Sequence, residues 1–241
     1  MKIATKKSFS VSETEMGIKN VDIIYPTHLL SGKSNRLFLL CDGRSNRSML
    51  AGQVVCDAVY TYFHSFSEEK ITIDFIEKAI RMAEIQLSEL QKEHSHKQGF
   101  STSLSLFYLE NDCAYLAQIG ESSVCQIRDN QVIMKVMDVS FDRKICGVHN
   151  PVEINVVLLK DVQAGDYFFI CNDTGISPDD EQVILDLMQQ IPQTEECLSE
   201  IKRYYQHKYN KHFSGHLIPI EQIREPQTIK QWMDSLVYSL I

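Results

Sequence analysis

The spacing of hydrophobic positions changes along the chain and separates strands from helices. Residues 37–43 are an apolar run that stops at an Asp-Gly pair, which is typical of a strand buried on both faces and followed by a turn. In residues 48–66 and 73–90 the apolar positions recur every three or four residues. That period predicts two consecutive helices after the buried strand.

From residue 101 onward the apolar period becomes two, which is typical of strands. Two hairpins are predicted, with turns at Asn111-Asp112 and Asp129-Asn130. Further elements are expected as strands at 152–160, 165–173 and 217–220, and as helices at 178–188, 194–207 and 227–241. We place the strand at 217–220 at a sheet edge, because Pro219 has no N–H to donate to a neighbouring strand.

Antiparallel hairpins interleaved with paired helices predict an α+β fold. In this fold two central antiparallel β-sheets are flanked by helices, and residues 1–241 form a single domain. The net charge of −8 argues against a nucleic-acid-binding surface, which would usually be basic, and against bulk attraction to an anionic membrane. Seven cysteines without a Cys-x-x-Cys pair indicate free thiols in a reducing compartment, which predicts a cytoplasmic protein.

Two of the predicted strands end in aspartates. The strand at 37–43 ends in Asp42 and Gly43, and the strand at 165–173 ends in Asp173. Strands that end at the same edge of a sheet would bring the two carboxylates around one site. Carboxylates, together with a backbone carbonyl that can be approached closely at a glycine, are the oxygen ligands that hard divalent cations require.

Several segments, in this order along the chain, resemble the metal-dependent protein serine/threonine phosphatases of the 2C class. The matching segments are Leu40-Cys41-Asp42-Gly43, Ala51 to Cys56, Gly99-Phe100-Ser101-Thr102, Ile119 to Ser123, and Gly165 to Asp173. The resemblance implies that family's α-β-β-α sandwich. It also implies hydrolysis of phosphoserine and phosphothreonine by water held between two Mg²⁺ or Mn²⁺ ions.

Carried over onto this sequence, the resemblance makes Asp42 the bridging metal ligand, Gly43 the carbonyl ligand and Asp173 the late-strand ligand. Asp22 matches an aspartate that lies behind the ligands. Glu121 stands where the family has an aspartate in a turn, so it keeps the carboxylate with a longer side chain.

The sequence departs from the family at other positions of the site. Val21 replaces a ligand glutamate, and residues 211–215, where the final aspartate ligand is expected, contain no carboxylate. Residues 17–20 lack the phosphate-binding arginine, and Ser45-Asn46 replace a Gly-Gly pair. With two of the four carboxylate ligands missing, we expect at most one Mg²⁺ or Mn²⁺ ion, or none.

Other side chains offer alternative chemistry near these positions. His212 lies at the vacant aspartate position and, like His207 and His216, is either a ligand for a transition metal or an ordinary histidine. Arg44 and Arg47 follow Asp42 directly. They are either solvated loop residues or an anion-binding pair that interacts with Asp42 in place of a metal.

Three functions remain open from the sequence. The first is a 2C-type phosphatase-like protein with an incomplete metal site, acting as a regulatory or binding module in signalling. The second is an active phosphatase with an altered metal site, and the third is a binder of phosphate or phosphopeptides. The expected partner is a phosphorylated protein or a signalling protein, and the sequence leaves the oligomeric state open.

Overall fold

The structure is a computed structural model, and it describes most of the chain in eleven stretches. They are residues 3–5, 9–13, 22–26, 36–42, 46–93, 100–120, 122–137, 144–146, 152–172, 176–210 and 212–222. Four predicted site residues and one predicted helix lie outside them, namely Gly43, Arg44, Glu121, Asp173 and residues 227–241.

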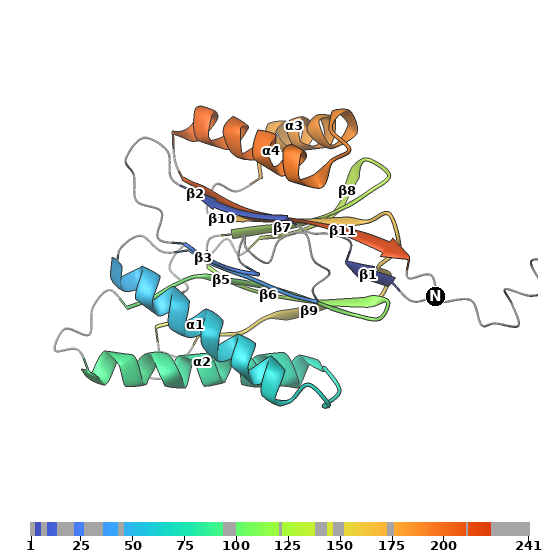
Figure 1. Ribbon diagram of the computed structural model, residues 1–241. Helices are drawn as coiled ribbons and strands as arrows, with labels where there is room; N and C mark the ends of the chain where they lie inside the picture. Colours follow the sequence, from blue (N-terminus) through green and yellow to red (C-terminus); the bar gives the residue numbers. More distant parts are fainter. Residues whose placement is uncertain are drawn as a thin grey trace, which may run out of the picture.

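The described strands form two antiparallel sheets that lie face to face (Figure 1). In the six-stranded sheet the order is β1-β11-β10-β7-β8, and β2 also pairs with β11. Its strands are β1 (Ile3–Thr5), β2 (Phe9–Glu13), β7 (Ser122–Arg128), β8 (Gln131–Met137), β10 (Tyr167–Asn172) and β11 (Phe213–Gln222). The five-stranded sheet has the order β3-β4-β5-β6-β9. Its strands are β3 (Ile23–Tyr25), β4 (Leu37–Cys41), β5 (Leu104–Glu110), β6 (Cys113–Ile119) and β9 (Val156–Leu159).

Paired helices cover the outer face of each sheet (Figure 1). The helices α1 (Asn46–Ser65) and α2 (Ile73–Glu93) lie on the five-stranded sheet, and α3 (Pro178–Gln190) and α4 (Thr194–Tyr209) lie on the six-stranded sheet. This arrangement confirms the predicted sandwich of two antiparallel sheets between helices. In the described part of the chain, no helix combines the length and the apolar character needed to cross a membrane.

The buried run at 37–41 explains how the layers are held together. Leu39 and Cys41 belong to the apolar cluster between the five-stranded sheet and α1 and α2. Phe38 and Leu40 belong to a second cluster between the two sheets. Alternate side chains of β4 therefore enter two different cores, which is why the sequence shows an unbroken apolar run instead of an alternating one.

The start of α3 follows from its sequence. Ser177 caps the helix by accepting a hydrogen bond from the N–H of Asp180, whose carboxylate in turn accepts one from the N–H of Ser177. Pro178 occupies the first turn, as predicted. The fully buried Asp180 carboxylate also accepts hydrogen bonds from Tyr204 and Lys208 on α4. The same side chain therefore caps α3 and binds it to α4.

The prediction that the last strand lies at a sheet edge is wrong. The strand β11 is central and longer than predicted, because β10 pairs with one side of it while β2 and β1 pair with the other. Leu217 is the last partner of β2, and Ile220 is the first partner of β1. The N–H of Ile220 points to β10, where it donates to Asp166. The nitrogen of Pro219, which carries no N–H, therefore points to the opposite side of β11. It lies in the gap between the end of the pairing with β2 and the start of the pairing with β1.

Three other strands are shorter than predicted, among them β10, which covers Tyr167–Asn172 of the expected 165–173. The strand expected from residue 101 begins at Leu104, because Thr102 pairs with Ile145 instead of continuing the β5 ladder. The strand expected at 152–160 is β9, Val156–Leu159. Ahead of it, the N–H of Val152 donates to the buried carboxylate of Glu84 on α2 at 2.9 Å. A side-chain acceptor thus replaces the ladder partner of that residue.

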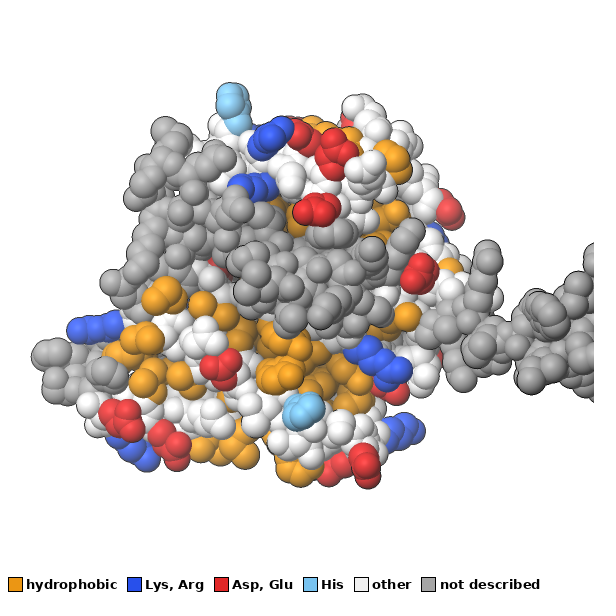
Figure 2. All heavy atoms as spheres, in the orientation of Figure 1, with side chains coloured by type: hydrophobic (Ala, Val, Ile, Leu, Met, Phe, Trp, Pro, Cys, Tyr) orange, Lys and Arg blue, Asp and Glu red, His pale blue; other side chains and the backbone are white. Residues whose placement is uncertain are grey.

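Hydrophobic side chains also gather on the outer surface of the layer formed by α1 and α2, in the lower half of Figure 2. The large exposed apolar side chains of these helices are Leu50, Tyr60, Ile73, Met82 and Ile85. Beside α1 is a cavity of about 300 Å³ whose lining includes Tyr25, Tyr60, Phe63 and Tyr108, with Arg36 and His64 as its basic side chains.

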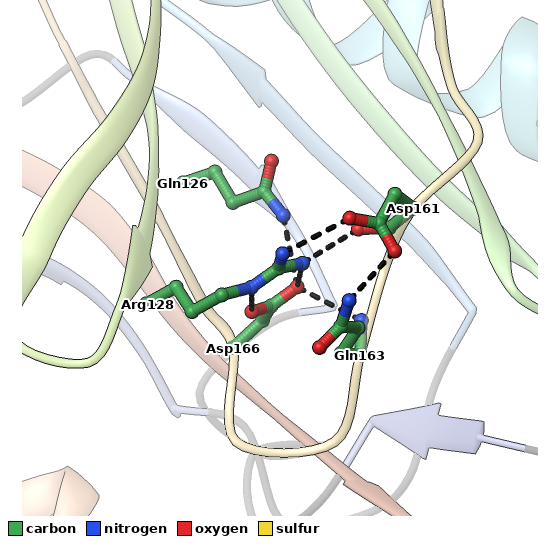
Figure 3. Close-up of polar contacts among 5 residues, drawn as sticks. All are labelled: Gln126, Arg128, Asp161, Gln163 and Asp166. Carbon is green, nitrogen blue, oxygen red and sulfur yellow. Dashed lines mark hydrogen bonds and ion pairs between the residues drawn. The ribbon is translucent and has the colours of Figure 1, made fainter.

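A partly buried ion-pair network holds the loop before β10 against the end of β7 (Figure 3). Arg128 donates to both carboxylate oxygens of Asp166, from Nε at 2.7 Å and from Nη2 at 2.9 Å. The same guanidinium donates to the carboxylate of Asp161 at 3.0 Å and to its carbonyl oxygen at 2.6 Å. Gln126 and the N–H of Gln163 also donate to Asp166. Because Asp166 is fully buried, these bonds replace the water that its carboxylate has lost.

We expect Asp166→Ala to lower the free energy of unfolding by about 3–5 kcal/mol, because it leaves a partly buried arginine without its main counter-ion. The matched control is Asp161→Ala, which removes a carboxylate that is 75% exposed and should cost about 1 kcal/mol or less. Urea unfolding of the two variants measures the difference. Equal losses would show that burial of Asp166 does not set the strength of the network.

Candidate functional site

Asp42 follows β4 and is fixed through its backbone. Its N–H donates to Ser103 Oγ at 3.1 Å, and its carbonyl oxygen accepts from Thr102 Oγ1 at 2.9 Å and from the N–H of Ser103 at 3.3 Å. These bonds come from the residues that precede β5, the strand paired with β4. The backbone of Asp42 is thus held at the rim of the sheet, as the Asp-Gly ending of the apolar run suggested.

Asp22 is brought next to Asp42 by the pairing of β3 with β4. Ile23 is opposite Cys41 in this antiparallel pair, so the register continues to Asp22 beside Asp42. The Asp22 carboxylate accepts a hydrogen bond from Asn172 Nδ2 at 3.1 Å. Asn172 ends β10 in the other sheet, and its Oδ1 accepts from the N–H of Ser214 in β11 at 3.3 Å. Asp22 is therefore held from both sheets.

Gly52 allows α1 to approach the two strands that carry these aspartates. A Cβ at this position would lie 3.2 Å from Cys41 Cβ and 3.2 Å from Ile23 Cγ1, closer than most such contacts. These two residues directly neighbour Asp42 and Asp22 in the sequence. Cys56 on the same helix places its Sγ 3.5 Å from Sγ of Cys41. Burial raises the pKa of the Cys41 thiol well above its usual range, so this cysteine packs as a small apolar side chain.

His212 completes a cluster with the two aspartates. It directly precedes β11, and its Nε2 lies 3.5 Å from Asp22 Oδ2 and 3.9 Å from Asp42 Oδ1. The side chain of Asp22 is fully buried, that of Asp42 is 6% exposed and that of His212 is 19% exposed. Both distances are long for a hydrogen bond to nitrogen, so the contacts are those of an ion pair.

The pKa values in the cluster reflect this pairing. The contacts with Asp22 and then with Asp42 raise the pKa of His212 to about 10, although its burial acts in the opposite direction. Burial raises the pKa of Asp22, but the contacts with His212 and Asp42 outweigh it and hold that pKa below its ordinary value. Two carboxylates facing one imidazole therefore favour a cation at this place.

The donor set decides which metal ions fit. Among the described residues, Asp22, Asp42 and His212 are the group whose ligand atoms lie together, all within 4.8 Å of one another. A pair of hard ions such as Mg²⁺ is held by a ring of oxygen ligands. The described donors supply two carboxylates and one nitrogen, so they do not fit a pair of hard ions by themselves.

The structure places the other predicted site residues as follows. Asp173 lies outside the described residues and stays a prediction, but β10, which it follows, ends at Asn172 beside Asp22. Arg47 lies in the first turn of α1, with Cζ 5.8 Å from the ring centre of Phe100. Its predicted pairing with Asp42 stays a prediction. His207 is an exposed residue in the last turn of α4.

The sequence alone could not decide which residue of 211–215 replaces the expected aspartate. The structure favours His212, because Phe213 is fully buried on the opposite side of the sheet, where its ring stacks on Phe169 and Tyr205. Asn172 and Ser103 were missed as site residues. The sequence could have indicated Asn172, since it directly precedes the predicted ligand Asp173. No sequence pattern marks Ser103 as the residue whose hydroxyl binds the backbone of Asp42.

No protein-family model matches this sequence, and neither does any curated protein. Several solved structures do match the fold. The serine/threonine phosphatase PstP/Ppp of Mycobacterium tuberculosis matches with a TM-score of 0.73 and 16% identity, over 92% of this chain and 100% of its own. The PPM Ser-Thr phosphatase MsPP of Mycobacterium smegmatis, solved with cacodylate, matches with a TM-score of 0.67 and 14% identity, over 90% and 97%.

This chain has the PPM phosphatase fold. PppA of Pseudomonas aeruginosa, described as a regulatory component of a T6SS, also matches, with a TM-score of 0.65 and 14% identity over 91% of this chain and 100% of its own. The agreement spans nearly the whole of both chains, which confirms the fold expected from the ordered sequence motifs. At these identities the comparison shows the PPM fold alone.

His216 is a second histidine near the site, but it lies inside the sandwich. It is fully buried on β11, and its Nε2 is 2.9 Å from the carbonyl oxygen of Leu39 on β4, a bond in which Nε2–H donates. Its ring meets the edge of Phe38 with centroids 5.6 Å apart. Burial lowers the pKa of His216 to about 4, from an ordinary value of 6.5. The imidazole is therefore neutral in the folded protein at pH 7.

We expect this histidine to make the protein less stable in acid. Between pH 6.5 and about 4 the unfolded chain binds a proton at His216 that the folded chain does not bind. Stability is therefore complete above pH 6.5 and is lost as the pH falls, by an amount on the order of 3 kcal/mol. His216→Gln keeps a donor at the same position without a titration. The difference in unfolding free energy between the wild-type protein and His216→Gln should change between pH 6.5 and about 4. A difference that stays constant over this pH range would contradict a lowered pKa of His216.

Proposed function

We propose that this protein is a PPM-fold regulatory or binding module that hydrolyses phosphoesters poorly or not at all. The observation that carries the proposal is His212, which faces Asp42 at the start of β11, where the family resemblance expects the last aspartate ligand. A side chain that is neutral or positive thus stands at a position that the two-metal reaction needs to be negative.

The electrostatic requirement of that reaction is large. Two divalent ions about 4 Å apart repel each other by roughly 16 kcal/mol at an effective dielectric constant near 20. A dense ring of carboxylates must offset this repulsion. In this chain His212 and Val21 stand where two of those carboxylates are expected. The catalytic domain of PstP, a structural neighbour, was solved in complex with two manganese ions. We infer that this chain does not hold such a pair.

The geometry of the cluster is compatible with a binding role. Asp22 and Asp42 are held by bonds from both sheets, and His212 lies opposite them. The hydrogen bonds hold polar groups around a donor set that we infer suits one cation instead of two. We propose a phosphorylated protein or another signalling protein as the partner. We also propose a cytoplasmic location, which fits the seven free cysteines.

Turnover with a phosphoserine peptide and with an aryl phosphate, in millimolar Mn²⁺ or Mg²⁺, tests the proposal. We expect rates at least ~10³-fold below those of a PPM phosphatase assayed beside it, because removal of one charge-stabilising group from such a centre typically costs about 10²–10³-fold and more than one is missing here. The loss from several missing groups need not add up.

The informative variant restores the expected carboxylates. Val21→Glu combined with His212→Asp should raise the Mn²⁺ affinity and the turnover number. The matched control combines Val21→Glu with His212→Asn, which has the size of the aspartate without its charge and should raise Mn²⁺ affinity less. Turnover of the unmodified protein at an ordinary enzymatic rate, abolished by Asp42→Ala, would replace the proposal with an active phosphatase that uses an altered metal site.

A further inference from the structure

The contact distances in the cluster of Asp22, Asp42 and His212 are longer than ordinary hydrogen bonds and close to the distances between ligands of one metal ion. His212 Nε2 lies 3.5 Å and 3.9 Å from one carboxylate oxygen of each aspartate. Around a tetrahedral zinc ion, with bonds of about 2.0–2.1 Å to nitrogen and oxygen, neighbouring ligand atoms are about 3.4 Å apart. The distances from His212 to the two aspartates are therefore about 0.1 Å and 0.5 Å longer than the spacing that one such ion imposes, and the ligand atoms of all three residues lie within 4.8 Å of one another.

The burial of the same atoms supports this interpretation. Nε2 of His212 has no access to solvent and no hydrogen-bond partner at an ordinary distance. The side chains that it faces are at most 6% exposed. A buried polar nitrogen aimed between two carboxylates costs stability unless a proton or a metal ion joins the groups. One divalent ion bound to all three would balance the two negative charges completely.

We propose that Asp22, Asp42 and His212 form a site for a single late first-row transition-metal ion, of which Zn²⁺ and Co²⁺ are the representatives. This goes beyond the proposed function, since it holds whether or not the protein turns over a phosphoester. Asp22, which the family resemblance places behind the metal ligands, becomes a ligand itself.

The identity of the third donor sets the preference among metals. Imidazole is a good ligand for Zn²⁺ and Co²⁺, whereas Mg²⁺ takes oxygen ligands almost exclusively. The exchange of an aspartate for His212 therefore changes the class of ion as well as the number of ions. Three protein ligands leave at least one coordination position open to a further ligand.

The groups behind the ligands already orient them. Asn172 donates to Asp22, and the N–H of Ser214 in turn fixes Asn172. Ser103 and Thr102 fix the backbone of Asp42. Such outer contacts lower the cost of organising the ligands when an ion binds, and their loss typically weakens metal affinity by about 10–100-fold.

Titration of the chelator-treated protein with Co²⁺, followed by visible absorption, tests the proposal. We expect intense ligand-field bands of four- or five-coordinate Co²⁺ that saturate at one equivalent, disappear when Zn²⁺ is added and persist in excess Mg²⁺. His212→Ala should weaken Co²⁺ binding by at least about 100-fold. The matched control is His207→Ala, which removes an exposed histidine of α4 and should leave the titration unchanged.

A reciprocal variant separates a lost ligand from a damaged fold. His212→Asp should remain folded by circular dichroism and should shift the preference from Co²⁺ and Zn²⁺ toward Mn²⁺ and Mg²⁺, because it restores an all-oxygen donor set. The proposal is overturned if the wild-type protein shows only the weak bands of six-coordinate Co²⁺. It is also overturned if two equivalents bind, or if His212→Asp leaves the metal preference unchanged. Metal binding without turnover would support the site and the proposed function together, whereas turnover with one bound ion would support the site alone.

Discussion

The structure at this end of the molecule depends on how the negative charges of two buried carboxylates are neutralised. Asp22 and Asp42 lie side by side because β3 and β4 pair antiparallel, and neither side chain is more than 6% exposed. Two like charges in such a place are unfavourable without a cation between them. His212 supplies either that cation or a ligand for one. The residue at position 212 therefore determines the chemistry of the site.

Both sheets must pack correctly for this neutralisation to occur. Asp22 and Asp42 belong to the five-stranded sheet, whereas Asn172 and His212 come from β10 and β11 of the other sheet. The hydrogen bond from His216 to the carbonyl of Leu39 joins the same two sheets through the core. At the opposite end of β10 from the site, the network of Arg128 and Asp166 fixes the start of the strand that leads to Asn172. The position of the polar groups thus depends on contacts spread across the sandwich.

The sequence predicts those parts of the structure whose signals are local. The apolar run of β4, the helical period of α1 and α2, and the hairpin turn at Asp129 and Asn130, with φ of 49° and 58°, follow from neighbouring residues. The first half of β11 does not, because Ser214, Gly215 and His216 suggest a loop by composition. They form a central strand only because β10 and β2 lie on either side. This is a case in which tertiary pairing overrides local preference.

In the candidate site, too, some residues are marked by their neighbours in the sequence, whereas others are identified only by the pairing of distant strands. Asp42 was recognisable because its own strand and turn mark it, and Asp22 by its place in the ordered motifs. The exact partner of these carboxylates was not recognisable, since His212 and Phe213 are adjacent in sequence yet lie on opposite sides of β11. A one-residue error in the register exchanges a site residue for a core residue. Distinguishing the two required the pairing of β11 with its neighbours.

The separation of the apolar cores from the polar end explains how one fold can carry different site chemistry. Three apolar clusters fill the spaces between the layers, and none of them includes Asp22, Asp42 or His212. An exchange of aspartate for histidine at position 212 affects a side chain outside these clusters that is 19% exposed. It changes the local charge by one or two units and replaces an oxygen ligand with nitrogen. In this chain the PPM fold thus keeps a pair of buried carboxylates, while the side chain opposite them decides whether a proton, one metal ion or a metal pair neutralises them.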